Sequence, residues 1–238
     1  MKSRPPTETP AGHSRNPYWL VATVGLVVVL AMIAAFAALL EQVGHGTGLA
    51  RYDLPAVAAL ATARNRGAVI LLRIVTTIGS PVAMTLIAVA VCGWIAWRIR
   101  GVTPLVIGTV GVGGIGAIDT ATKDGVARAR PPVRLHAVEA GGYSFPSGHA
   151  IFSALVVLLC ATLLTRWVVR GRGPRGVLWV SSIVLILAVG FSRVFLGVHY
   201  PSDILAGWAL AIAWGTTVLV TSGLLPPGGG PLPSSARR

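Results

Sequence analysis

The stretch YWLVATVGLVVVLAMIAAFAALL, residues Tyr18 to Leu40, runs for 23 residues without a charged side chain. A helix needs about 20 mostly apolar residues to cross a bilayer, so this run predicts a membrane span. The basic residues Lys2, Arg4 and Arg15 precede it. Because Ala35-Phe36-Ala37 resembles a signal-peptidase site, a cleaved signal peptide is the alternative. The length of the run and the apolar runs that follow it favour a retained helix.

The rest of the chain agrees with a membrane protein. Of 238 residues, 54% are apolar and only 11% are charged, which excludes an ordinary soluble domain. Five further apolar stretches follow the first, at Pro81–Trp97, Pro104–Thr122, Pro146–Thr165, Val177–Phe191 and Asp203–Ser222. The predicted fold class is therefore an all-α integral membrane bundle of six transmembrane helices.

The segments outside these stretches are polar or mixed. Residues 1–17 and 223–238 are rich in Pro, Gly and Ser, which predicts two disordered tails around one domain at residues 18–222. Leu54 to Arg66 is expected to form a short amphipathic helix at the membrane interface. No internal repeat stands out.

The net charge of +13 would suggest a nucleic-acid partner in a soluble protein. Here the basic residues lie mostly between apolar stretches, so we expect no nucleic acid and relate them to orientation in the bilayer. The loop TRWVVRGRGPRG, at residues 165–176, carries four arginines and no acidic residue. We therefore expect this loop and both tails to be cytoplasmic.

Two features within the apolar stretches point away from common soluble sites. Gly111, Gly113 and Gly116 match G-x-G-x-x-G, but no strand precedes them, so close helix packing is favoured over dinucleotide binding. Cys92 and Cys160 also lie inside apolar stretches. They are expected to be small buried residues, not a disulfide or a metal pair.

The first of three polar clusters is KDGVARARPP, in which Lys123 and Arg130 are seven residues apart. Two helical turns would place both cations on one face, with Pro131 and Pro132 ending the helix. The alternative is a pair of cationic anchors that extend toward the headgroups.

The second cluster is PSGH at residues 146–149. Pro146 suits the first position of a helix, which would leave the N–H groups of Ser147, Gly148 and His149 free to bind an anion. The alternative is a capped helix start with an interfacial histidine.

The third cluster is SRVFLGVHYPSD, with Ser192, Arg193, His199 and Asp203. His199 and Asp203 are four residues apart, so the carboxylate can hold one ring nitrogen and leave the other nucleophilic. The alternative is a structural salt bridge.

On a six-span map all three clusters fall at one membrane face. Ionisable groups gathered at a membrane edge indicate a functional site, and cations beside a helix N-terminus describe a phosphate site. The pattern K-x6-R-P, P-S-G-H, S-R-x5-H-x3-D resembles the type-2 phosphatidic acid phosphatase (PAP2) superfamily, over about residues 50–220.

The resemblance implies roles for individual residues. His199 would attack phosphorus to form a phosphohistidine, Asp203 would orient it, and His149 would protonate the leaving oxygen and later activate water. The phosphate oxygens would be held by Lys123, Arg130, Ser147, Gly148 and Arg193. Neither a metal nor another cofactor is expected.

The resemblance also implies a function. We expect a membrane phosphatase acting on a lipid phosphate or diphosphate at the outer face of a bacterial plasma membrane. The substrate would be a polyprenyl diphosphate, a phosphatidylglycerol phosphate or phosphatidate. The alternatives are a phosphotransferase of the same fold and a non-catalytic transporter or scaffold, which would need no nucleophile. A haloperoxidase is less favoured because those relatives are soluble. The sequence does not indicate an oligomeric state.

Four further arginines flank the expected interfacial helix, namely Arg51, Arg64, Arg66 and Arg73. They would either anchor the helix among headgroups or line the entrance to the site. In the second case they would favour a substrate with more than one negative group, such as a polyprenyl diphosphate.

Overall fold

The computed structural model describes residues 18–223, so the two predicted tails lie outside it apart from Gly223. All regular structure in this part of the chain is helical, which confirms the predicted class. Six helices are long and apolar enough to cross a membrane, and the chain is an integral membrane protein. They are α1 (Tyr18–His45), α4 (Pro81–Ile99), α5 (Thr103–Val126), α6 (Gly148–Trp167), α7 (Arg172–Phe195) and α8 (Pro201–Thr221).

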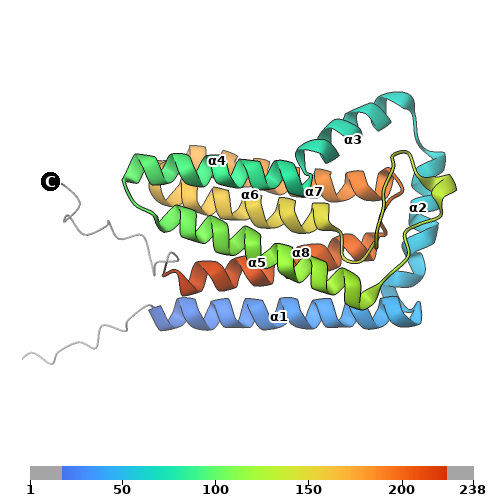
Figure 1. The fold of residues 1–238 in the computed structure, drawn as a ribbon, viewed down its shortest axis with the longest axis horizontal. Coiled ribbons are helices and arrows are strands. Elements are labelled where there is room, and N and C mark those ends of the chain that lie inside the picture. The colour runs from blue at the N-terminus through green and yellow to red at the C-terminus, as the bar shows by residue number, and fades with distance from the viewer. Residues whose placement is uncertain (1–17, 224–238) are drawn as a thin grey trace, which may run out of the picture.

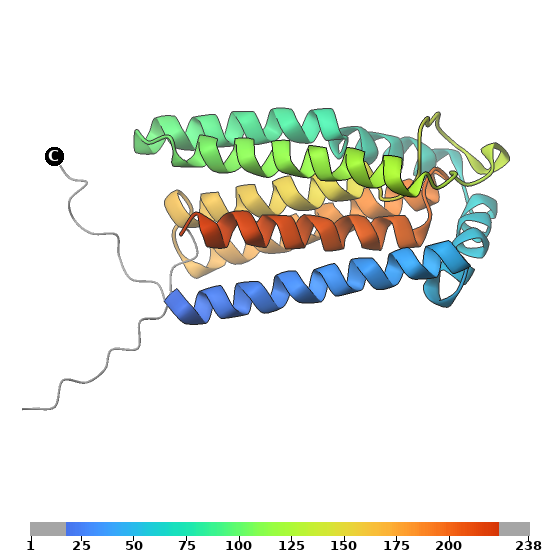
Figure 2. The same ribbon diagram turned by 60° about the horizontal axis from the view of Figure 1, so that its bottom comes forward.

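The six long helices lie roughly parallel to the long axis of the molecule (Figures 1 and 2). Helix α6 is central, packing against α4, α5, α7 and α8. In its most apolar window 67% of the residues are buried, compared with 6% in α1. A helix that is apolar around its whole circumference is surrounded either by other helices, as α6 is, or by lipid, as most of α1 would be. Cys92 and Cys160 are buried and free, as predicted.

Helix α1 packs along α8 at the outside of the bundle. It continues without a break through Ala35-Phe36-Ala37 to His45. Phe36 and Leu39 pack with Phe145 and Ala206, which ties this helix to the core. This packing is what the interpretation as a retained helix requires.

Glycines allow helices α5, α6 and α8 to approach closely. A Cβ atom at Gly111 would lie 2.6 Å from Cδ1 of Leu159, and one at Gly114 would collide with the indole of Trp214. The indole Nε1 of Trp214 donates to the carbonyl oxygen of Gly111 at 2.9 Å. The helix-packing interpretation is therefore confirmed for Gly111. A Cβ at Gly116 would make only an ordinary contact with Phe152 at 3.7 Å, and Gly113 faces open space.

The short elements gather at one end of the bundle, where α2 lies across the helix ends and α3 leans outward (Figure 1). They are η1 (Gly48–Tyr52), α2 (Asp53–Thr62), α3 (Arg66–Ile78) and η2 (Val133–Leu135). The short helix predicted over Leu54–Arg66 forms as α2, but it ends at Thr62, so the predicted end at Arg66 is wrong. Asn65 caps α3 by accepting the N–H of Ala68 at 2.8 Å, so a new helix begins there.

The opposite end of the bundle holds the start of α1, the end of α8 and the loop between α6 and α7 (Figures 1 and 2). Within residues 18–223, six spans place the start of α1 and the end of α8 at the same end of the bundle. The predicted even number of spans is confirmed.

Candidate active site

The N-terminus of α6 is one wall of the site. The helix begins at Gly148, and Ser147 is its cap, with Oγ accepting the N–H of Ala150 at 3.4 Å. The prediction that Pro146 is the first helical residue is wrong, because the serine side chain takes the capping position after it. The first N–H groups of α6, at Gly148 and His149, still have no acceptor within the helix.

The two cations of the first cluster reach the site from different elements. Helix α5 ends at Val126, where Ala127 adopts a left-handed conformation with φ of 49°. The prediction that Lys123 and Arg130 share a helical face is therefore wrong, and Pro131 does not end the helix. Lys123 remains on α5, and its Nζ would lie 3.1 Å from a Cβ at Gly148.

Arg130 lies in the loop after α5, and backbone carbonyls hold its guanidinium. Its Nε and Nη2 donate to the carbonyl oxygen of Gly141 at 3.1 and 2.9 Å. Its Nη1 donates to the carbonyl oxygen of Val198 at 2.7 Å and to Nε2 of His199 at 3.0 Å. The loop between α5 and α6 is thus fixed against the turn before α8, with one cationic N–H at the histidine.

His199 lies in that turn and is 1% exposed. Its Nδ1 is 3.3 Å from Oδ2 of Asp203. An arginine N–H can only donate, so Nε2 must accept from Arg130 and the proton must be on Nδ1, facing the carboxylate. Burial, followed by the charges of Arg130, Arg193 and Lys123, holds the pKa of His199 well below its ordinary value of 6.5. The ring is therefore neutral, and the lone pair on Nε2 accepts the N–H of Arg130.

Asp203, at the start of α8, is held from both sides. Its Oδ1 accepts from Nη1 of Arg128 at 2.5 Å. Its Oδ2 accepts from the backbone N–H of Tyr200 at 2.9 Å, as well as facing His199. Sequence reasoning missed Arg128, which lies two residues before Arg130 and was treated as a spacer within the K-x6-R-P pattern.

Sequence reasoning also missed Thr76 and Asp119, two polar residues that contact the predicted cations Arg193 and Lys123. Arg193 is buried at the end of α7, and its Nη1 donates to Oγ1 of Thr76 on α3 at 2.7 Å. Its Nε finds no partner among residues 18–223. Lys123 pairs with Asp119 one turn earlier on α5 at 2.5 Å. The spacing of four could have indicated that pair. Nothing in the sequence links Thr76 to Arg193.

The structure brings all three predicted clusters together. His149 is half-buried and lies within Coulombic range of Arg193, His199, Arg130 and Lys123. The backbone N–H of Ser147 donates to the carbonyl oxygen of Asp203 at 3.1 Å, which joins the starts of α6 and α8. Cations, a helix N-terminus and a neutral imidazole therefore meet at one end of the bundle. Such an arrangement can bind an anion and attack it.

Arg64 does not belong to an entrance. Its Nε donates to the carbonyl oxygen of Phe195 and its Nη1 to that of Leu135, both at 2.7 Å. Arg73 likewise donates to the carbonyl oxygen of Ala137. The entrance hypothesis is therefore wrong for Arg64, which fastens the end of α7 to the loop after α5.

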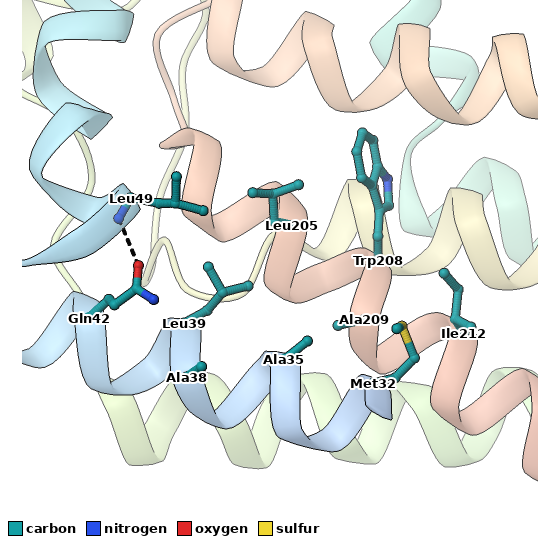
Figure 3. Close-up of a pocket in the computed structure, with 10 residues that line it drawn as sticks. All are labelled: Met32, Ala35, Ala38, Leu39, Gln42, Leu49, Leu205, Trp208, Ala209 and Ile212. Carbon is teal, nitrogen blue, oxygen red and sulfur yellow. Dashed lines mark hydrogen bonds between the residues drawn. The ribbon is translucent and has the colours of Figure 1, made fainter. Parts of the chain in front are cut away.

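An apolar cavity of about 390 Å³ lies between α1 and α8 (Figure 3). Its walls include Met32, Leu39, Leu205 and Trp208. Its polar side chain Gln42 accepts the N–H of Leu49 at 2.7 Å. No candidate site residue lines it, so this cavity is not the anion site.

The comparisons with known proteins agree with this arrangement. The family model described as the PAP2 superfamily matches residues 102–224, which include all eight candidate site residues. A solved transmembrane PAP2 type phosphatidylglycerolphosphate phosphatase from Bacillus subtilis has the same fold, with a TM-score of 0.73 and 22% identity. The alignment covers 80% of this chain and 93% of that one.

Relatives at higher identity align over shorter regions. Phosphatidylglycerophosphatase B of Bacillus subtilis is 32% identical over 38% of this chain and 44% of its own length. Phosphatidylglycerophosphatase B of Escherichia coli K12 is 36% identical over 40% of this chain and 37% of its own length. An undecaprenyl-diphosphatase of Sulfolobus acidocaldarius is 34% identical over 29% of this chain and 28% of its own length. The chain thus spans less than half the length of these relatives.

Proposed function

The chain belongs to the PAP2 superfamily, and from this we propose that it is a metal-independent lipid phosphatase with His199 as its nucleophile. One observation carries the proposal. The buried imidazole has its Nδ1 toward Asp203 and its lone pair on Nε2, beside the cationic N–H of Arg130. A nucleophilic histidine needs a lone pair on one nitrogen and an orienting acceptor on the other. The lone pair on Nε2 would attack once Arg130 moves its N–H from Nε2 to a phosphate oxygen.

In the first step Nε2 of His199 attacks the terminal phosphorus, and the bond from phosphorus to the lipid-side oxygen breaks. His149 donates a proton to that oxygen as it leaves. The imidazole then carries phosphate on Nε2 and a proton on Nδ1, so it is positive. The carboxylate of Asp203 stabilises this charge.

In the second step His149 takes a proton from water, whose oxygen attacks phosphorus. The bond from phosphorus to Nε2 breaks, inorganic phosphate leaves, and His199 returns to its neutral form. The same residue acts as acid in one step and as base in the next.

The remaining candidates would hold the phosphate oxygens. Lys123, Arg130 and Arg193 supply positive charge, and the start of α6 supplies the N–H of Gly148 and the hydroxyl of Ser147 as donors, because the N–H of Ser147 is bonded to Asp203. Phosphoryl transfer spreads negative charge over the equatorial oxygens, so donors fixed around one phosphate lower the barrier. Gly148 allows close approach, since a Cβ there would lie 3.1 Å from Nζ of Lys123.

The substrate would be a membrane lipid with a terminal phosphate, and its chains would stay in the bilayer. The relatives' names point to phosphatidylglycerol phosphate or a polyprenyl diphosphate. We place the active site at the outer face of the plasma membrane, because the arginine-rich loop between α6 and α7 is at the other end of the bundle (Figure 1).

The test is phosphate release by the purified protein in micelles containing phosphatidylglycerol phosphate, a polyprenyl diphosphate or phosphatidate. We expect turnover of at least one lipid, lost in His199→Ala and kept in Arg134→Gln, which changes an exposed arginine of the neighbouring loop. A lipid labelled in its terminal phosphate should leave acid-labile label on the wild-type protein. Release of phosphate by His199→Ala at the wild-type rate would contradict the mechanism.

A further inference from the structure

A chain of buried charges continues from the candidate nucleophile to the interfacial helix α2. It runs from His199 through Asp203 and Arg128 to Asp53. The side chains of Asp53 and Arg128 are only 3% and 16% exposed, and that of Asp203 is fully buried. Ionised groups are rarely buried at such cost without a role beyond stability, because apolar residues would stabilise the fold as well.

Arg128 links the two carboxylates with different nitrogens of one guanidinium. Its Nη1 donates to Oδ1 of Asp203 at 2.5 Å, and its Nη2 donates to Oδ2 of Asp53 at 2.7 Å. The planar group also stacks over the ring of Tyr200, 4.2 Å from its centroid. These contacts leave the arginine head one orientation. Lysine has a single nitrogen and cannot reproduce both contacts.

Asp53 fixes this arginine to the start of α8. Its Oδ1 accepts the backbone N–H of Ser202 at 3.0 Å, and its Oδ2 accepts the hydroxyl of Ser202 at 2.5 Å. A carboxylate at a helix N-terminus is favourable because the free N–H groups there are partly positive. Asp203 follows Ser202 in the first turn of α8. By binding Ser202, Asp53 at the start of α2 therefore fixes the positions of the two carboxylates that Arg128 joins.

Among the contacts that link His199, Asp203, Arg128 and Asp53, the one between Asp203 and His199 is the longest, at 3.3 Å. The shorter bonds from Arg128 and from the N–H of Tyr200 therefore set the direction of the carboxylate. We propose that Arg128 is a positioning residue for His199, acting through Asp203, and that Asp53 anchors it from α2. This inference rests on the proposed function of His199.

The charges support this assignment. The phosphorylated imidazole of the proposed intermediate is positive, and it needs the negative charge of Asp203. Arg128 alone would neutralise that carboxylate. With Asp53 as a second partner, the three groups together keep one negative charge beside His199. The pair Asp53 and Arg128 thus orients the carboxylate without cancelling its charge.

The kinetic test compares Arg128→Gln, Arg128→Lys and Asp53→Asn with the control Arg134→Gln. We expect kcat to fall about 10–100-fold in Arg128→Gln, as when an outer partner of an active-site histidine is lost, with KM little changed. The fall in kcat should be smaller in Arg128→Lys. The double variant of Asp53→Asn with Arg128→Gln should lose no more than Arg128→Gln alone, because both act through Asp203. If the loss of kcat in the double variant equalled the product of the losses in the two single variants, the proposal would be overturned.

A spectroscopic test needs no substrate. In protein labelled with ring ¹⁵N-histidine, His199, assigned by its absence in His199→Gln, should show a protonated Nδ1 and a bare Nε2. Arg128→Gln should change this state, and Arg134→Gln should not. A merely structural role would lower the melting temperature and leave the tautomer of folded protein unchanged, and that result would overturn the proposal. If no lipid is hydrolysed but the tautomer depends on Arg128, only the proposed function fails.

Discussion

Replacing Asp203 with Asn changes one oxygen into an NH₂ group at a fully buried position. In the wild type, Oδ1 accepts from Arg128, and Oδ2 accepts from the N–H of Tyr200 and faces Nδ1 of His199. All of these neighbours are donors, and the side chain of Asp203 is 0% exposed. An amide can accept only on its oxygen, so neither of its two orientations satisfies both sides.

Each orientation has its own consequence. If the oxygen faces Arg128, the NH₂ group faces His199 and forces the proton onto Nε2, which removes the nucleophilic lone pair. If the oxygen faces His199, the NH₂ group faces the cation of Arg128. Losing one member of a buried ion pair costs about 3–5 kcal/mol of folding free energy. We expect the lower end, because Arg128 keeps Asp53.

The expected fall in kcat is on the order of 10⁴-fold, as when an amide replaces the orienting carboxylate of a catalytic triad. Phosphate release and the melting temperature should be measured on the same detergent-solubilised preparation, with the substrate that the wild type turns over best. A folded Asp203→Asn protein whose kcat lies within about tenfold of wild type, a barrier change of only about 1.4 kcal/mol, would refute the reasoning.

Four other predictions follow from the same geometry. His149→Ala should lower kcat about 10²–10⁴-fold, and less for a lipid analogue whose leaving oxygen needs no proton; an equal loss on both would argue against an acid role. Folding lowers the pKa of His199, so its ring should stay neutral in the folded protein as the pH falls below 6.5, while the same ring takes up a proton in the unfolded chain. The melting temperature should therefore fall below pH 6.5. ¹⁵N shifts showing that both ring nitrogens of His199 carry a proton near pH 6.5 would contradict this. A membrane-impermeant thiol reagent applied to intact cells should label a cysteine placed at Val138 but not one placed at Gly173, and the reverse would invert the topology. Activity should survive EDTA, since side-chain cations supply the positive charge, and vanadate should inhibit because it can become five-coordinate; strict magnesium dependence without vanadate inhibition would count against the mechanism.

The spans and the site could be predicted because each rests on local sequence. Hydropathy alone located the six long helices, and the glycines of the third long apolar run predicted close helix packing, which the structure shows at Gly111. The site residues were visible because polar groups are costly within apolar runs. His199 and Asp203 are four residues apart, so a single turn determines how they meet.

The arginine bridge could not be predicted because it joins distant parts of the chain. Arg128 is 75 residues from both Asp53 and Asp203, and no periodicity relates such positions. The end of α5 was missed for a different reason. Ala127 adopts a left-handed conformation, which alanine rarely does, so nothing at this residue indicated that the helix ends before Pro131.

Ion pairing decides which basic residues should be counted when the orientation of the chain in the bilayer is inferred. At the site end of the bundle Lys123 is neutralised by Asp119, and Arg128 lies between Asp53 and Asp203. These cations serve the site and do not act as topological charges. The loop between α6 and α7 carries Arg166, Arg170, Arg172 and Arg175 with no acidic residue beside them. When the paired cations are set aside, the remaining positive charge favours this loop as the cytoplasmic side, which agrees with the proposal that the phosphate chemistry takes place at the other face.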